Sequence, residues 1–138
     1  MAFRPYLFFG GTCRDAFTQY QEIFGGELNV VTMADVPGET PPPDQADVVI
    51  HAALVNDDLV LMGSDDPMSS EVGPVQGIMV TYDAADLADA NRVFDALAAG
   101  GTVTQAVEPT FFSEGFGMCT DRFGTPWMIV APDPNQPG

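Results

Sequence analysis

The chain has 138 residues, a length that suits one folded domain, and 46% of them are hydrophobic, which is enough to form a buried core. Only four residues are basic, all of them arginine, against 20 acidic residues, and the formal net charge is −16. Nucleic acids and anionic membranes bind clustered cations, so this charge excludes both as expected partners.

The sequence predicts a cytoplasmic protein. No apolar run is long enough to cross a membrane, and no basic segment followed by an apolar run resembles a signal peptide. Cys13 and Cys119 are far apart and do not have the spacing of a metal site, so we expect two free thiols. The acidity is typical of a soluble protein in a salty cytoplasm; an acidic binding patch is the alternative.

In the first half, hydrophobic patterning predicts a strand, a helix and three further strands. The first strand is Pro5–Phe9. Cys13–Phe24 has the apolar stripe of an amphipathic helix, with Thr12 as its N-cap and Gly25-Gly26 as its stop. A proline-rich loop is expected in this half over Val36–Asp47, and the remaining strands are Glu27–Ala34, Val48–Val55 and Leu59–Ser64.

The second half repeats this order. Gly77–Tyr82 is the expected strand, and Asp83 is the expected N-cap of a helix over Ala84–Ala99. Gly100-Gly101 ends the helix as Gly25-Gly26 ends the first one. The last predicted elements are a strand over Thr102–Val107 and a closing hairpin over Phe116–Val130 with its turn at Asp121–Gly124.

The internal repeat predicts the fold class. Two βαβββ units are expected at about residues 5–64 and about 77–131, joined by a linker over 65–75 and followed by a tail over 132–138, in a single domain over 1–138. One helix covers only one face of each sheet, so the bare faces can curl together and enclose a cavity. We therefore expect an α+β fold with a cupped mixed sheet and the helices on its convex face.

Three segments in order carry a family resemblance: YLFFGGTCRDAFTQYQEIFGGEL, HAALVNDDLVLMGSDD and TFFSEGFGMCTDRFGTPWMIV. Over roughly Pro5 to Val130 the chain resembles the PhnB-like branch of the vicinal-oxygen-chelate superfamily, which includes glyoxalase I, bleomycin-resistance proteins and extradiol dioxygenases. The resemblance implies a homodimer, which would cover exposed sheet edges. Many members of this branch are labelled as relatives of a demethylubiquinone methyltransferase. This chain lacks a glycine-rich loop between a strand and a helix suited to an adenosyl cofactor.

Metal-using members of that superfamily hold a divalent ion with His, Glu or Gln, one from each of four strands. Aligning the repeat with that pattern puts the four positions near Pro5–Leu7, at Met62, near Gly77 and at Met128. None of them offers a hard oxygen or an imidazole, which a divalent ion such as Mg or Zn requires. The resemblance therefore predicts no metal and no cofactor in this chain.

The same alignment indicates which residues line the cup. If Met128 faces the cup, Trp127 faces the helices and belongs to the core, because side chains alternate along a strand. Methionine is flexible and polarisable, so a cup lined by it suits irregular apolar ligands. Phe111, Phe112 and Phe116 either line the ligand site or serve as loop anchors or dimer contacts. The predicted ligand-binding residues are Met62, Ser64, Met79, Phe111, Phe112, Phe116 and Met128.

Two residues are weak catalytic candidates. His51 is the only histidine, and it is either a general base or ligand anchor in the cup or a half-buried histidine with a backbone partner. Glu114 lies where the family usually has Phe-Trp-Gly-Ala and this chain has Phe-Phe-Ser-Glu; it is either a base or a solvated loop acid. Asp65 and Asp66 are expected to form a turn, and Cys119 is expected to be inert.

Three functions remain open. The first is a metal-independent protein that binds a small apolar molecule in the sheet cup. The second is a metal-dependent lyase, isomerase or dioxygenase of the same superfamily. The third is an antibiotic-sequestering resistance protein, for which the net charge of −16 would attract a cationic glycopeptide. The sequence leaves open whether there is any catalytic turnover.

Overall fold

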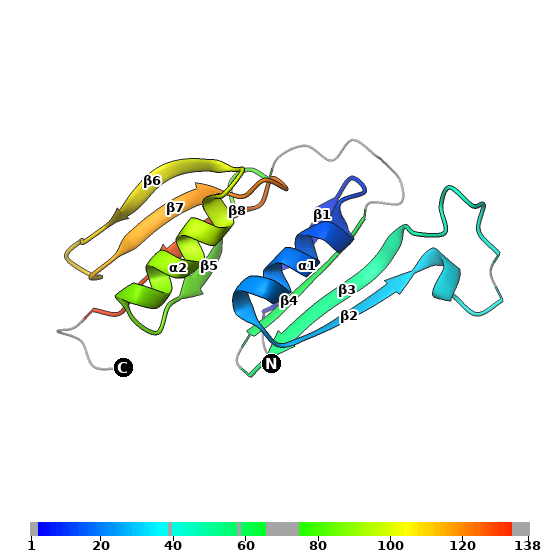
Figure 1. The fold of residues 1–138 in the computed structure, drawn as a ribbon, viewed down its shortest axis with the longest axis horizontal. Helices are drawn as coiled ribbons and strands as arrows, with labels where there is room; N and C mark the ends of the chain where they lie inside the picture. The colour runs from blue at the N-terminus through cyan, green and yellow to red at the C-terminus, as the bar shows by residue number, and fades with distance from the viewer. Residues whose placement is uncertain (1–2, 39, 58, 66–74, 134–138) are drawn as a thin grey trace. The chain divides into compact units, whose positions relative to one another are not determined.

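The computed structural model describes residues 3–38, 40–57, 59–65 and 75–133. The chain forms two compact units, Met1–Val72 and Gly73–Gly138. Each unit has one long helix against a four-stranded sheet (Figure 1). No helix within the described ranges is long and apolar enough to cross a membrane.

The sheet of the first unit has the order β1-β4-β3-β2. β1 is parallel to β4, whereas β3 is antiparallel to both of its neighbours, β4 and β2. The elements are β1 Tyr6–Phe9, α1 Cys13–Phe24, β2 Glu27–Thr32, the 3-10 turn η1 Met33–Asp35, β3 Val49–Asn56 and β4 Leu59–Asp65.

The second unit has the same topology, with the order β5-β8-β7-β6 and β5 parallel to β8. Its elements are β5 Val80–Asp83, α2 Leu87–Ala98, β6 Thr102–Glu108, β7 Phe116–Thr120 and β8 Pro126–Val130. The predicted repeat and the α+β class with mixed sheets are confirmed. Closure of the two units into one cupped domain stays a prediction.

A glycine defines which face of the first sheet carries α1. A Cβ added to Gly63 in β4 would lie 2.9 Å from Cε1 of Phe17 in α1, so Gly63 faces the helix. Its neighbours Met62 and Ser64 therefore face away from α1. The buried face of α1 consists of Cys13, Ala16, Phe17, Tyr20 and Ile23.

The second unit has the same arrangement. A Cβ added to Gly117 in β7 would lie 3.0 Å from Cε2 of Phe94 in α2. Trp127 and Ile129 in β8 are buried, with 2% and 0% of their surface exposed. Met128, between them, faces away from α2, as the sequence predicted.

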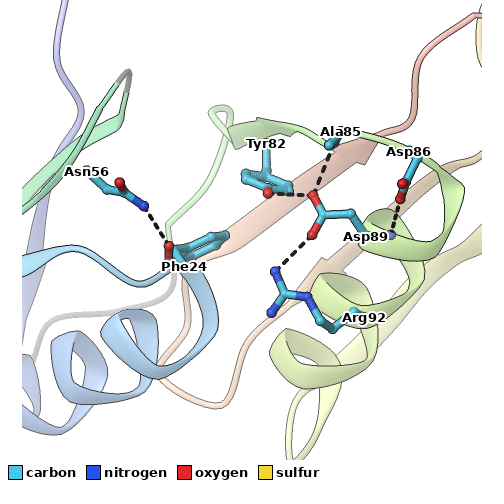
Figure 2. A network of polar contacts seen from close by, with 7 residues as sticks. All are labelled: Phe24, Asn56, Tyr82, Ala85, Asp86, Asp89 and Arg92. Carbon is cyan, nitrogen blue, oxygen red and sulfur yellow. Dashed lines mark hydrogen bonds and ion pairs between the residues drawn. The ribbon is translucent and has the colours of Figure 1, made fainter.

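The two glycine pairs have one structural role. Gly25 and Gly100 end the helices with φ of 73° and 77°, which glycine adopts without strain. A Cβ on Gly26 or Gly101 would clash with the main chain at the end of the neighbouring strand. The second glycine therefore lets the returning strand start close to its partner. In the first unit Asn56 also donates a hydrogen bond to the carbonyl of Phe24, at 2.9 Å (Figure 2).

The predicted start of the second helix is wrong. α2 begins at Leu87, and its N-cap is Asp86, whose carboxylate accepts a hydrogen bond from the backbone N–H of Asp89 at 2.7 Å (Figure 2). Asp83 instead ends β5. The reason is that the N–H of Ala84 donates to the carbonyl of Val130, so strand pairing continues past Asp83.

The predicted N-cap position of the first helix is confirmed, because Thr12 is the N-cap residue of α1, but the expected capping bond is not made. The side chain of Thr12 accepts no hydrogen bond from the first turn. Asp65, expected to form a turn, is the last residue of β4, and its carboxylate accepts from the backbone N–H groups of Gly11, Cys13 and Val49. Asp66 and most of the predicted linker and tail lie outside the described residues.

Some strand bounds also differ from the sequence prediction. β5 begins at Val80, because Gly77 has a φ of 77° and Ile78 is 67% exposed, and neither continues the sheet. The described residues of Val36–Asp47 form turns and loop with no strand or helix, as predicted.

Candidate functional site

The face of the second sheet that points away from α2 is the helix-free face of this unit. Tyr82 faces α2, because its hydroxyl bonds to Asp89 of that helix, so Thr81 and Asp83 point to the other side. Val107 also faces the helix side, since a Cβ on Gly117 would meet it, so Glu108 points away. Strand register arranges this face as two rows: Thr81, Met128, Met118, Gln105 and Asp83, Val130, Phe116, Glu108.

The centre of this face is apolar and its edges are polar. The four central side chains are all half-buried, and they are Phe116, Met118, Met128 and Val130. A carboxylate stands at each end of one row, Asp83 and Glu108, and both residues are exposed. The face therefore offers flexible apolar contacts with acidic groups beside them.

Aromatic residues extend the apolar surface beyond β7. The ring of Phe112 lies 5.3 Å from that of Phe116 in an edge-to-face arrangement, and the ring of Phe111 lies 5.1 Å from that of Phe112. Phe111 is 95% exposed and Phe112 is 42% exposed. Their loop is anchored by Ser113, which is 2% exposed and donates to the carbonyl of Ala131. Sequence reasoning missed Ser113, which has no motif to mark it.

The other predicted residues of this unit lie at the margin of the face. Glu114 is half-buried, and its backbone N–H donates to the carbonyl of Pro132 at 3.2 Å. Met79 is half-buried and precedes β5, so it lies outside the two rows.

The helix-free face of the first unit carries His51. Strand register arranges one row as Tyr6, Met62, Ala53, Asn29. A second row has the pairs Phe8 with Ser64 and His51 with Val31, and side-chain alternation past the pair Ala52 and Gly63 puts Ser64 and His51 on the same face. Nδ1 of His51 lies 3.3 Å from the hydroxyl of Tyr6, and the two rings stack at 5.8 Å. His51 therefore has a side-chain partner. If Tyr6 donates, Nδ1 is unprotonated and Nε2 carries the proton, ready to donate to a ligand.

The residues at the expected metal positions do not fit a divalent ion. Register aligns Tyr6 with Met62 in the first unit and Thr81 with Met128 in the second, so Thr81 replaces Gly77 as the equivalent position. A phenol, a hydroxyl and two thioethers are poor ligands for Mg, Mn or Zn. Within the ranges that the structure describes, no group of three or more His, Cys, Asp or Glu side chains could hold a metal ion.

A polar network lies on the opposite, helix-bearing side of the second sheet. Asp89 accepts from the Tyr82 hydroxyl at 2.7 Å and pairs with Arg92 at 2.8 Å (Figure 2). Burial disfavours the Asp89 carboxylate, but the hydrogen bonds from Tyr82, Ala85 and Arg92 outweigh it and lower the pKa. Burial and the bond to Asp89 raise the pKa of Tyr82 to about 12.

The cysteines take no part in either face. Cys13 and Cys119 are free, and neither exposes any surface. Burial, with a smaller effect from Asp65, raises the pKa of Cys13 to about 12, and burial with Asp121 raises that of Cys119 to about 11. The thiolate is the reactive form, so a raised pKa and full burial both favour the inert thiol that the sequence predicts for Cys119.

Comparison with known proteins gives the family. A family model described as 3-demethylubiquinone-9 3-methyltransferase matches residues 1–130. Protein YjdN of Escherichia coli is 33% identical over 150 residues, which cover 99% of this chain and 100% of that protein. The crystal structure of protein PA1353 from Pseudomonas aeruginosa has a TM-score of 0.83 and 37% identity, and the match covers 96% of this chain and 98% of that chain.

Two more distant structures share the fold. A putative 3-demethylubiquinone-9 3-methyltransferase, PhnB protein, from Bacillus cereus has a TM-score of 0.76 and 20% identity, with 95% of this chain and 99% of that chain covered. A glyoxalase/bleomycin resistance protein/dioxygenase family enzyme from Burkholderia phytofirmans has a TM-score of 0.62 and 14% identity, with 94% of this chain and 97% of that chain covered. The chain therefore shares its fold with the PhnB protein and with the glyoxalase/bleomycin resistance protein/dioxygenase family enzyme, as the sequence resemblance predicted. It belongs to the family described as 3-demethylubiquinone-9 3-methyltransferase.

Proposed function

We propose that this protein binds a small, predominantly apolar molecule on the helix-free faces of its sheets, without a metal ion. The observation that carries the proposal is the half-buried apolar centre of the second face, made of Phe116, Met118, Met128 and Val130. An apolar sheet face that no helix covers is a usual place for a ligand or partner. Two methionines at its centre would let it adapt to ligands of irregular shape.

The predicted contacts divide between the units. In the first unit they are Met62 and Ser64, with His51 as an anchor that donates from Nε2. In the second unit Phe112 and Phe116 offer ring edges and faces. The further predicted contacts are Met79, Phe111 and Met128, and Glu114 remains the candidate for a base.

The alternatives have weaker support. Metal-dependent lyase, isomerase or dioxygenase chemistry needs hard ligands, and Tyr6, Met62, Thr81 and Met128 are not such ligands. Methyl transfer from an adenosyl cofactor has weaker support because the sequence lacks a glycine-rich loop between a strand and a helix suited to that cofactor. Sequestration of an antibiotic is binding without chemistry and would differ from the proposed function only in its ligand.

A titration with the neutral apolar dye Nile red tests the binding. We expect saturable fluorescence enhancement with about one dye per face. Met128→Gln, which keeps the side-chain length but adds an amide, is expected to weaken it several-fold because apolar contact is lost. Val103→Gln is the matched control, because Val103 is 51% exposed on β6 and lies opposite Cys119, on the helix side. Equal binding by both variants would contradict the proposal.

Two further measurements test the rest of the proposal. Elemental analysis and melting with Mg, Mn, Fe, Co, Ni and Zn should give no stoichiometric metal and no stabilisation, because a bound ion would raise the melting temperature. One ion per chain would overturn metal independence. We also propose a homodimer, which would cover edge strands of the two sheets. A monomer mass by light scattering at micromolar concentration would refute it.

A further inference from the structure

We infer that the molecule bound on the helix-free face of the second unit is an organic cation with an apolar body, and that its charged group lies beside Glu108 and Phe116. This inference rests on the proposed function, because it names the ligand class of the same face. It follows from the order of side chains across the sheet, from the positions of the arginines and from the net charge.

On this face a carboxylate is paired with an aromatic ring. Glu108 in β6 is the register partner of Phe116 in β7, and both side chains point away from α2. Directly paired residues have Cβ atoms about 5 Å apart. A carboxylate and an aromatic ring on two directly paired residues suit an ammonium group, which gains a charge-assisted hydrogen bond and a cation–π contact together.

The row that contains Glu108 and Phe116 ends in a second carboxylate. Beyond Phe116 the row continues through Val130 to Asp83, so a second carboxylate stands at the far end. The parallel row supplies Met118 and Met128 beside them. A ligand with a cationic end and an apolar body would therefore find an acidic group at either end and apolar side chains between.

The basic residues of this unit lie away from the two rows. The described part of the second unit has two arginines. Arg92 pairs with Asp89 at 2.8 Å on the helix side (Figure 2). Arg122 lies in the turn between β7 and β8, with its guanidinium carbon 4.7 Å from the ring centroid of Phe123. Neither belongs to the two rows, so no basic residue of this unit neutralises Glu108 or Asp83 there.

Charge complementarity selects the occupant. The whole chain carries a net charge of −16, which attracts cations and repels anions. The two rows of the first unit contain no carboxylate; their ends are Tyr6, Asn29, Phe8 and Val31. A third row on the same face carries Glu27, but its register partner is Val55 and not an aromatic residue. The pairing of a carboxylate with an aromatic ring is therefore found on the face of the second unit, and the inference applies to that face.

Three naphthalene probes of equal size test the inference: 1-naphthylmethylammonium, neutral 1-naphthalenemethanol and anionic 1-naphthoate. Isothermal titration calorimetry with the full chain should rank them in that order of affinity. The preference for the ammonium should shrink as salt is raised, because salt screens exposed charges. Glu108→Gln should weaken ammonium binding about threefold to fivefold and leave the alcohol unchanged.

Two variants control the charge change. Asp95→Asn removes the same unit charge from an exposed position on α2, on the other side of the sheet, and should leave ammonium binding unchanged. Asp83→Asn removes the carboxylate at the far end of the row and should have a smaller effect than Glu108→Gln. A larger effect of Asp83→Asn would overturn the assignment to Glu108.

The outcomes separate the inference from the proposed function. If the alcohol binds as tightly as the ammonium, or Glu108→Gln has no effect, the cation inference is wrong while apolar binding stands. If none of the three probes binds and Nile red does not bind either, both are wrong. Unchanged melting temperatures of the variants show that each one is folded.

Discussion

The carboxylate of Asp65, the last residue of β4, accepts a hydrogen bond from the backbone N–H of Cys13, the first residue of α1, at 3.0 Å. The same side chain accepts from Gly11 at 3.0 Å and from Val49 in β3 at 3.1 Å. Asp65 is only 5% exposed. One buried carboxylate therefore links β4, β3 and the N-terminus of α1, where the helix dipole also favours negative charge.

Replacing Asp65 with alanine should destabilise the protein more than removing an ordinary helix cap. Asp65→Ala leaves three backbone N–H groups without their acceptor, and we expect a loss of about 3 kcal/mol in the free energy of unfolding. Asp86→Ala removes the exposed cap of α2 and should cost about 1 kcal/mol. Urea unfolding followed by circular dichroism measures both. Equal losses would show that burial of Asp65 adds nothing.

Asp121 should control the environment of Trp127, the single tryptophan of the chain. Its carboxylate accepts from the Trp127 indole N–H at 2.9 Å and from the backbone N–H groups of Phe123 and Thr125 at 2.9 and 3.0 Å. Asp121→Asn has one acceptor oxygen for these donors, so we expect a loss of about 2 kcal/mol and a shifted tryptophan emission spectrum. The exposed Asp95→Asn is the control. An unshifted spectrum in Asp121→Asn would contradict the contact.

Tyr82 should make stability fall at alkaline pH. Its pKa is raised from 10 to about 12 by burial and by the bond to Asp89, so the unfolded state loses this proton first. The stabilisation is complete below pH 10 and is lost as the pH rises toward 12. Comparing the wild type with Tyr82→Phe between pH 9 and 11.5 cancels the titration of the cysteines. The free energy of unfolding of the wild type, minus that of Tyr82→Phe, should fall by on the order of 1 kcal/mol as the pH rises over this range. A constant difference would refute the linkage.

Cys13 and Cys119 should react with thiol reagents only when the protein unfolds. Both are fully buried, and burial raises their pKa values to about 12 and about 11. At pH 8 we expect almost no modification of the native protein and modification of both thiols in denaturant. Rapid reaction of one thiol per native chain would place that cysteine at the surface.

The sequence by itself determined the elements and the repeat. Helical and alternating periodicities, the glycine pairs and the closing hairpin are local signals, and they located all eight strands and both α-helices of the structure to within a few residues. The alternation in β8 also separated the buried Trp127 from Met128 on the other face. Local backbone preferences and burial patterns carry this information over a few neighbouring residues.

Only the tertiary structure decided which distant residues meet. Asp65 caps a helix that begins 52 residues earlier, and Tyr6 lies against His51, 45 residues away. On the helix-free face of the second unit, the register shift between Gln105 and Glu108 puts two residues of β6, Ala106 and Val107, opposite one of β7, Gly117, so Glu108 is paired with Phe116. The physical reason is that strand register and helix capping are set by pairing across the sheet. A local sequence pattern contains no information on which distant strand or side chain pairs with a segment, or in which register.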